Sequence, residues 1–77
     1  MSKHTYKTRH LAEAAALIVM GLKFIRMERE GAICWFAFDD NAKCSSVSND
    51  FFFGSLLVNA REYHDAMSLL KNRVYSK

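Results

Sequence analysis

Runs of apolar and polar residues divide the chain into two strands and three helices. The most apolar run, Ala32 to Phe38, holds no polar side chain. It is too short and too aromatic for a helix, so it predicts a buried strand. Alternate side chains of a strand face opposite sides, and both sides are apolar here, so each needs a covering layer. The two faces are Cys34, Phe36 and Phe38 on one side and Ile33, Trp35 and Ala37 on the other.

A helical pattern lies ahead of this strand. Thr8 is expected to cap a helix that runs to Gly21, a residue suited to a helix end. Its early turns carry Glu13 on the side away from the core, but Leu17 and Met20 make its last turns apolar nearly all round. A helix of that kind is buried on more than one side.

Leu22 to Arg29 predicts the first strand of a hairpin, with charged ends that suit a sheet edge. Strict alternation places Phe24 on one face and both Ile25 and Met27 on the other. Glu30 and Gly31 form the turn, in which Gly31 is expected to adopt the left-handed conformation of a bulged type I turn.

Two further helices are expected after the hairpin. Asp39, Asp40 and Asn41 supply a turn and a cap for a helix from about Ala42 to Phe53, which Gly54 ends. The rings of residues 51–53 cannot all enter one core, so at least one reaches the surface or a partner. Asn59, with Glu62, starts the last helix in the manner of a capping box. The apolar stripe of that helix is Tyr63, Met67, Leu70 and Val74.

These elements predict an α+β fold: a helix, a two-stranded antiparallel hairpin, then two helices. The first and last helices are expected on one face of the hairpin. Residues 1–77 form a single domain, in which residues 1–7 are a basic N-terminal segment, either a binding arm or a frayed terminus. Because an isolated hairpin is barely stable in water, we expect dimerisation to extend or cover the sheet.

The apolar content favours a partner. Of 77 residues, 51% are hydrophobic, which is a large supply for so small an interior. We expect a homodimer whose hairpins join edge to edge or pack through the face carrying Trp35; a host or viral protein is the other candidate partner. The candidate protein interface is Leu17, Met20, Ile33, Trp35 and Phe52.

The charge leaves a second binding hypothesis open. A formal net charge of +3 is compatible with nucleic acid without being diagnostic of it. Basic residues beside exposed Trp35 or a ring of residues 51–53 would suit single-stranded DNA or RNA. The candidate nucleic-acid contacts are Lys3, Lys7, Arg9, Lys23, Arg26 and Arg29.

No constellation of residues predicts chemistry. The histidines have no metal-ligand spacing and the three glycines do not form a phosphate loop, so no catalytic residue, metal site or cofactor is expected, and the chain is not expected to be an enzyme. Cys34 and Cys44 are interpreted as free thiols of a cytoplasmic protein, with a strand-to-helix bridge as the alternative. No apolar run approaches the roughly 20 residues of a membrane span, so no membrane partner is expected.

The order of motifs also carries a resemblance. It comprises Tyr6-Lys7-Thr8, the alanine-rich helix to Gly21, Phe36-Ala37-Phe38-Asp39-Asp40, Gly54, Val58, and a last helix with Tyr63, Leu70 and Lys71. In these features the chain resembles a family of short proteins of unknown function encoded by bacteriophages and bacteria. Phe51-Phe52-Phe53 stands where such proteins usually have a tyrosine-rich stretch. The resemblance implies a small phage or prophage protein and transfers no catalytic residue.

Overall fold

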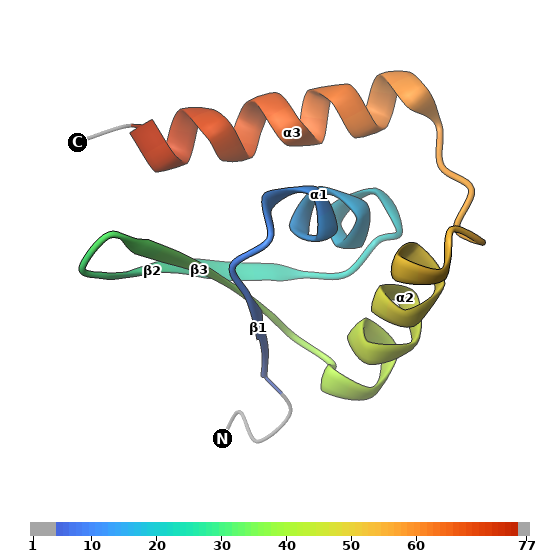
Figure 1. Cartoon of the computed structure of the whole chain (residues 1–77), viewed down its shortest axis with the longest axis horizontal. Helices are drawn as coiled ribbons and strands as arrows, with labels where there is room; N and C mark the ends of the chain where they lie inside the picture. The colour runs from blue at the N-terminus through green and yellow to red at the C-terminus, as the bar shows by residue number, and fades with distance from the viewer. Residues whose placement is uncertain (1–4, 76–77) are drawn as a thin grey trace.

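Three strands form one antiparallel sheet in the computed structural model, which describes residues 5–75. The strands are β1 (Tyr6–Thr8), β2 (Phe24–Glu30) and β3 (Ile33–Phe38), in the order β1-β3-β2 (Figure 1). The α+β class is confirmed, but the two-stranded hairpin is wrong because β1 adds a third strand. The apolar strand β3 is therefore central and has a neighbour on each side.

Strand β1 belongs to the segment that was expected to be a basic arm. Tyr6 pairs with Phe38 and Thr8 pairs with Phe36, so the chain itself extends the hairpin on this side. For Tyr6 and Lys7 the arm is thus a sheet strand, and residues 1–4 of that segment lie outside the described residues. The hairpin gains its third strand from its own chain, which removes the need for a partner at this edge.

Helix α1 (Leu11–Val19) lies between the sheet and the last helix (Figure 1). Ala14, Ala15, Ala16 and Leu17 are all buried, which confirms the expectation of a helix covered on more than one side. Alanine side chains are small, so α1 can be packed closely from two directions. The expected Thr8 cap is wrong, because Thr8 lies in β1 and the N-cap position falls at His10.

A one-residue irregularity changes the faces of β2. Phe24 pairs with Phe38 and Arg26 pairs with Ala37, so Ile25 is an extra residue in β2. Beyond it Met27 packs against the core on the same side as Phe24, while Ile25 is exposed. The expected grouping of Ile25 with Met27 is wrong, because a bulge shifts the alternation by one position.

The hairpin turn is tighter than expected. Glu30 pairs with Ile33, so the loop consists of Gly31 and Ala32 alone. Gly31 has a φ of 63°, which confirms its left-handed conformation. A positive φ at the first of two loop residues fits a primed hairpin turn, whose twist matches that of the strands.

The remaining helices are α2 (Asn41–Phe53) and α3 (Ala60–Tyr75). Asp40 accepts a hydrogen bond from the Lys43 amide at the start of α2, and Gly54 ends it in the left-handed conformation. Asn59 Oδ1 accepts one from the Glu62 amide at 3.0 Å, so the three expected terminal residues are confirmed.

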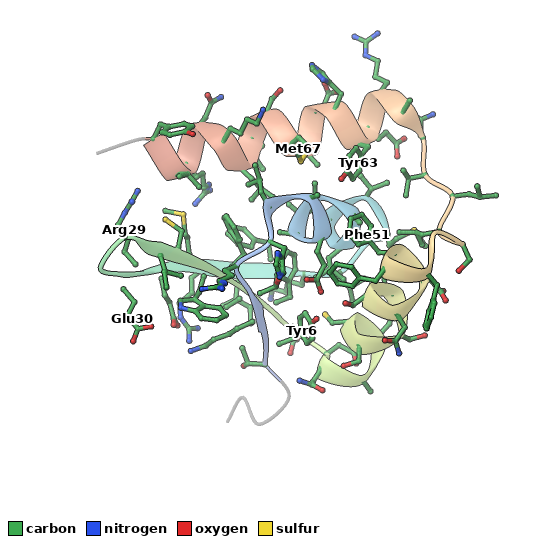
Figure 2. All side chains as sticks on the ribbon, viewed as in Figure 1. Tyr6, Arg29, Glu30, Phe51, Tyr63 and Met67 are labelled. Carbon is green, nitrogen blue, oxygen red and sulfur yellow. The ribbon has the colours of Figure 1, made fainter. Side chains whose placement is uncertain are left out.

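Helix α3 lies over α1 on the side away from the sheet (Figure 1). Its labelled residues Tyr63 and Met67 are directed toward α1, and the Tyr63 hydroxyl donates a hydrogen bond to the Ala12 carbonyl at 3.0 Å (Figure 2). Leu70 of α3 is fully buried in the same core as Phe36 and Phe38 of β3. The helices thus cover one face of the sheet, and the other face is covered by the side chains of the strands themselves.

Candidate functional site

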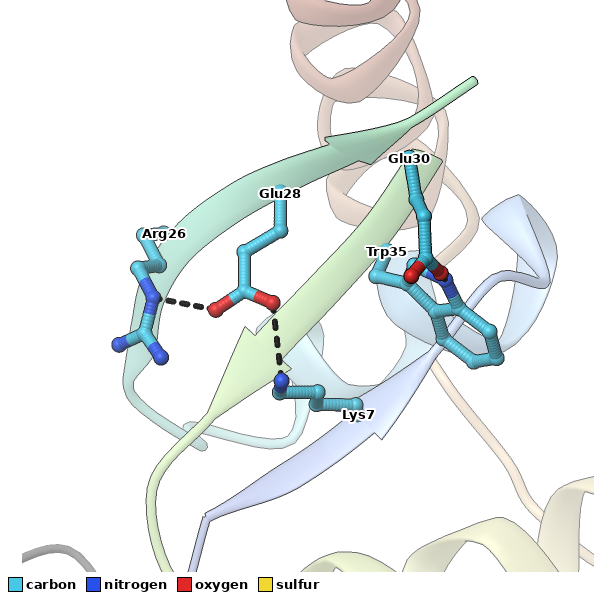
Figure 3. A network of polar contacts seen from close by, with 5 residues as sticks. All are labelled: Lys7, Arg26, Glu28, Glu30 and Trp35. Carbon is cyan, nitrogen blue, oxygen red and sulfur yellow. Dashed lines mark hydrogen bonds and ion pairs between the residues drawn. The ribbon is translucent and has the colours of Figure 1, made fainter. Parts of the chain in front are cut away.

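The outer sheet face, defined here by Lys7, Arg26, Glu28, Glu30 and Trp35, lies on the side of the sheet away from α1 and α3 and carries a network of polar contacts (Figure 1 and Figure 3). Glu28 of β2 accepts from Lys7 Nζ at 2.8 Å and from Arg26 Nε at 2.6 Å. These hydrogen bonds lower the pKa of the Glu28 carboxyl, with that from Lys7 the larger cause. The three side chains link the outer strands β1 and β2 across the central strand β3.

This charged cluster explains how the second apolar face of β3 is covered. Ala37 pairs with Lys7 on one side and Arg26 on the other, and it is fully buried. Trp35 is half-buried, and its indole Nε1 donates to Glu30 Oε1 at 3.2 Å. Long charged side chains cover apolar surface with their stems while their charges stay in water. The apolar face therefore does not require a partner to be shielded.

A hollow of about 340 Å³ lies on the same face. It is lined by Lys7, Arg29, Trp35 and the carboxylates of Glu28 and Glu30. Because charges of both signs meet there, the hollow has no strong preference for an anion such as a phosphate backbone.

A second cavity, the α3 pocket, has a different character. Its volume is about 380 Å³, and it lies between the start of α1, the end of β3 next to the hairpin loop, and the last turns of α3. Arg9, His10 and Lys71 line it together with the half-buried thiol of Cys34. Apolar walls come from Leu11, Ile33, Phe36 and Val74. Pockets of this size commonly hold small molecules.

The structure does not gather the candidate protein interface in one place. Leu17 is fully buried in the chain's own core, so its assignment to an interface is wrong. Met20 is exposed after the end of α1, and Phe52 is exposed on α2, where its ring meets that of His10. Trp35 lies half-buried on the side of β3 opposite Phe36, and Ile33, also half-buried, lines the α3 pocket.

The candidate nucleic-acid contacts are also divided. Lys7 and Arg26 are paired with Glu28, and Arg29 Nη2 donates to the Val74 carbonyl at 2.5 Å. Figure 2 shows Arg29 and Glu30 at the end of the hairpin, below the last turns of α3. Arg9 lines the α3 pocket, Lys23 is exposed before β2, and Lys3 lies outside the described residues.

One family comparison bears on identity. A family model described as a domain of unknown function, DUF5659, matches residues 3–76. The chain belongs to this family. No curated protein and no solved structure matches this chain. The expectation of an uncharacterised family is confirmed, and the DUF5659 match assigns no activity to any of the surfaces described above.

This DUF5659 chain also contains a polar cluster that the sequence did not predict. Glu13 is 2% exposed, and its carboxylate accepts from the hydroxyls of Tyr6 at 2.5 Å and Thr8 at 2.6 Å. Burial and, to a lesser extent, the Glu13 bond raise the pKa of Tyr6. The expected position of Glu13 on the side away from the core is wrong. The two hydroxyls reach α1 only because β1 pairs into the sheet. No local pattern in the sequence therefore indicated the cluster.

Both cysteines of this DUF5659 chain are free thiols, as expected. Cys44 is fully buried, and its thiol donates to the Asp39 carbonyl at 3.3 Å. Burial, with nearby Asp40, Glu13 and Asp39, raises its pKa to about 11. A buried thiol with a raised pKa is unreactive, so Cys44 is a packing residue.

Several exposed apolar residues of this chain were not among the candidates. Phe53 and Leu57 are 86% and 90% exposed, one at the end of α2 and the other in the segment before α3. Exposure of Phe52 and Phe53 confirms that the three rings do not all enter one core. Within residues 5–75, no helix has the length and apolar character needed to cross a membrane.

Proposed function

We propose that this domain is a small non-enzymatic protein-interaction module that acts as a homodimer, joined through strand β2. The observation that carries the proposal is the free edge of β2 and the self-complementary order of its charges. In the described sheet β2 pairs only with β3, so its other edge is open. An open edge is a template for another strand.

The hairpin register indicates which backbone groups face that edge. Glu30 and Ile33 flank the two-residue loop, where a turn places its closing hydrogen bond. Hydrogen-bonded and non-hydrogen-bonded pairs alternate along an antiparallel ladder. Arg26 and Glu28 therefore direct their backbone groups toward β3, while Met27 and Arg29 direct theirs to the free edge.

A second copy fits this edge with favourable charges. If two β2 strands run antiparallel about a two-fold axis at Met27, Arg26 of one copy lies opposite Glu28 of the other, and the reverse pair also forms. Opposite charges placed directly across a ladder stabilise it, and like charges destabilise it. A two-fold axis makes such an interface self-complementary. The product is a continuous six-stranded sheet.

The nucleic-acid alternative has less support. Three of its basic candidates already have partners within the chain, and the outer sheet face contributes Glu28 and Glu30 beside Trp35. A heterologous partner, such as a host or viral protein, could use the same open edge. The resemblance to short phage and bacterial proteins adds a phage or prophage origin and a cytoplasmic location to the proposal.

Light scattering and sedimentation velocity test the homodimer. The wild-type protein is expected at twice the 8.9 kDa mass of one chain. Arg26→Glu places like charges opposite each other in both cross-strand pairs and is expected to yield a monomer. The double variant Arg26→Glu/Glu28→Arg restores opposite charges and should restore the dimer.

Lys23→Glu is the matched control, since it makes the same charge change at an exposed residue before β2. It is expected to remain dimeric. A wild-type protein that stays monomeric at millimolar concentration contradicts the proposal. If the wild type is a dimer and Arg26→Glu does not weaken it, the β2 interface is contradicted. The protein would then self-associate through another surface. An oligonucleotide titration at low salt covers the alternative, because phosphate contacts would give a steep salt dependence.

A further inference from the structure

The α3 pocket differs from the hollow on the outer sheet face in combining a cavity with charge of one sign. It has a volume of about 380 Å³ and draws its walls from the start of α1, the part of β3 next to the hairpin loop and the last turns of α3. These segments are far apart in sequence. The core packing that holds α1 against β3 and α3 therefore also shapes the cavity.

The polar groups of the pocket favour an anion. Arg9, His10 and Lys71 line it, and its described lining includes no Asp or Glu. Among the described residues, neither Arg9 nor Lys71 forms an ion pair, in contrast to Lys7 and Arg26 on the outer sheet face. Two cationic side chains at one cavity are thus available for charge-assisted hydrogen bonds with a carboxylate, sulfonate or phosphate.

The rest of the lining favours an apolar body attached to that anion. Phe36 is 1% exposed and forms part of the core, while Ile33 and Val74 are half-buried beside it. A typical small-molecule site has this composition, with mostly apolar walls and a few polar groups that fix orientation. An inorganic ion would leave these walls unused.

We propose that the α3 pocket binds a small organic anion. Arg9 and Lys71 hold its charged group, and Phe36, Ile33 and Val74 enclose its apolar part. This site lies on the side of the sheet that carries the helices, apart from the outward-facing charges of Arg26 and Glu28. It is therefore independent of the proposed dimer.

The probe for this site is 8-anilinonaphthalene-1-sulfonate, an aromatic anion whose fluorescence rises on binding to an apolar surface. Its neutral analogue, N-phenyl-1-naphthylamine, lacks the sulfonate. We expect one site per chain for the anion. The neutral analogue should bind about tenfold or more weakly, because it cannot make the charged hydrogen bonds.

Matched variants assign that site to the pocket. Arg9→Gln/Lys71→Gln should weaken the anion about tenfold or more, and should abolish its preference over the neutral analogue. Lys43→Gln/Arg61→Gln removes the same charge from exposed positions outside the pocket and should leave the affinity unchanged. Equal losses in both variants would reveal a general charge effect and overturn the proposal.

Two further measurements distinguish the pocket from exposed apolar surface. Phe53→Ser/Leu57→Ser removes the two most exposed large apolar side chains and should not change binding. The anion should also slow alkylation of Cys34, with the fully buried Cys44 as an internal reference for folding. Binding lost in Phe53→Ser/Leu57→Ser, or Cys34 alkylation that the anion does not slow, overturns the proposal.

Discussion

The hydroxyl of Tyr6 donates a hydrogen bond to Oε2 of Glu13, which joins strand β1 to the buried helix α1. Thr8 donates to the other carboxylate oxygen at 2.6 Å, so both oxygens of Glu13 are occupied. A buried carboxylate is costly unless hydrogen bonds compensate for the lost water. Strand β1 therefore contributes more than a second ladder of backbone hydrogen bonds, since it also supplies the two donors that allow Glu13 to lie in the core.

Tyr6→Phe removes one of these donors and keeps the ring. We expect the variant to lower the free energy of unfolding by about 1.5–3 kcal/mol, the usual range for a hydrogen bond to a charged group. Urea denaturation measures this change. Tyr75→Phe is the control, because Tyr75 is 80% exposed and should change stability by less than about 0.5 kcal/mol. Equal effects of the two substitutions would contradict the role of the Tyr6 hydroxyl.

The bulge at Ile25 gives a second prediction. Met27→Ala should lower the free energy of unfolding by about 1–2 kcal/mol, because Met27 is half-buried against the core. Ile25→Ala should cost less than about 0.5 kcal/mol, because Ile25 is an exposed residue outside the regular alternation. Thermal unfolding of both variants at a concentration that keeps them monomeric tests the difference. Similar losses would indicate an unbroken strand without a bulge.

Local signals in the sequence predicted the hairpin and the helix ends. Gly31 and Gly54 adopt positive φ angles where the chain turns, and Asp40 and Asn59 accept backbone hydrogen bonds at helix starts. Each of these features depends on a few adjacent residues. The stability of β1 instead comes from pairing with β3 about 30 residues later. Three residues carry too little pattern to predict such a strand.

The candidate surfaces were less predictable than the elements. One extra residue at Ile25 moves Met27 to the core side, and nothing in the local pattern marks it. The Lys7–Glu28 pair joins residues 21 apart, and it forms only because β1 lies on the far side of β3 from β2. The apolar face of Trp35 and Ala37 suggested a dimer because the third strand and its charged cover were not foreseen.

Cys44 provides a prediction about alkaline stability. Its folded pKa of about 11 exceeds the ordinary value of 9.0, so the unfolded chain releases the thiol proton first as pH rises. Stability is therefore lost from about pH 9 upward, and the loss continues to about pH 11. Cys44→Ala should flatten this decline. The raised pKa values of Tyr6 and Tyr63 act in the same direction and leave a residual slope.

Urea denaturation across that pH range measures the slopes. Val47→Ala is the control, because Val47 is a buried neighbour on α2 with no titratable group. It should lower stability at every pH and keep the wild-type slope. A Cys44→Ala variant that retains the full alkaline decline would show that the thiol is not responsible for it.

A substitution at Arg29 distinguishes a structural role of this residue from a role in binding nucleic acid. Its guanidinium donates to the Val74 carbonyl in the last turn of α3, where a cation also complements the helix dipole. Arg29→Met should therefore lower stability by about 0.5–1.5 kcal/mol and increase amide exchange in that turn. Arg61→Met is the control at the opposite end of α3. Removing a cation near a helix N-terminus should leave stability unchanged or slightly higher.

The same pair of variants gives a readout for binding. If Arg29 acts only through Val74, Arg29→Met and Arg61→Met should bind a single-stranded oligonucleotide with the same affinity as the wild type. If the wild type does not bind the oligonucleotide, neither variant should bind it. A phosphate contact at Arg29 would instead reduce both the affinity and its salt slope, by about one unit in the slope. Reduced binding in Arg29→Met, without faster exchange at the end of α3, would assign Arg29 to the nucleic-acid surface.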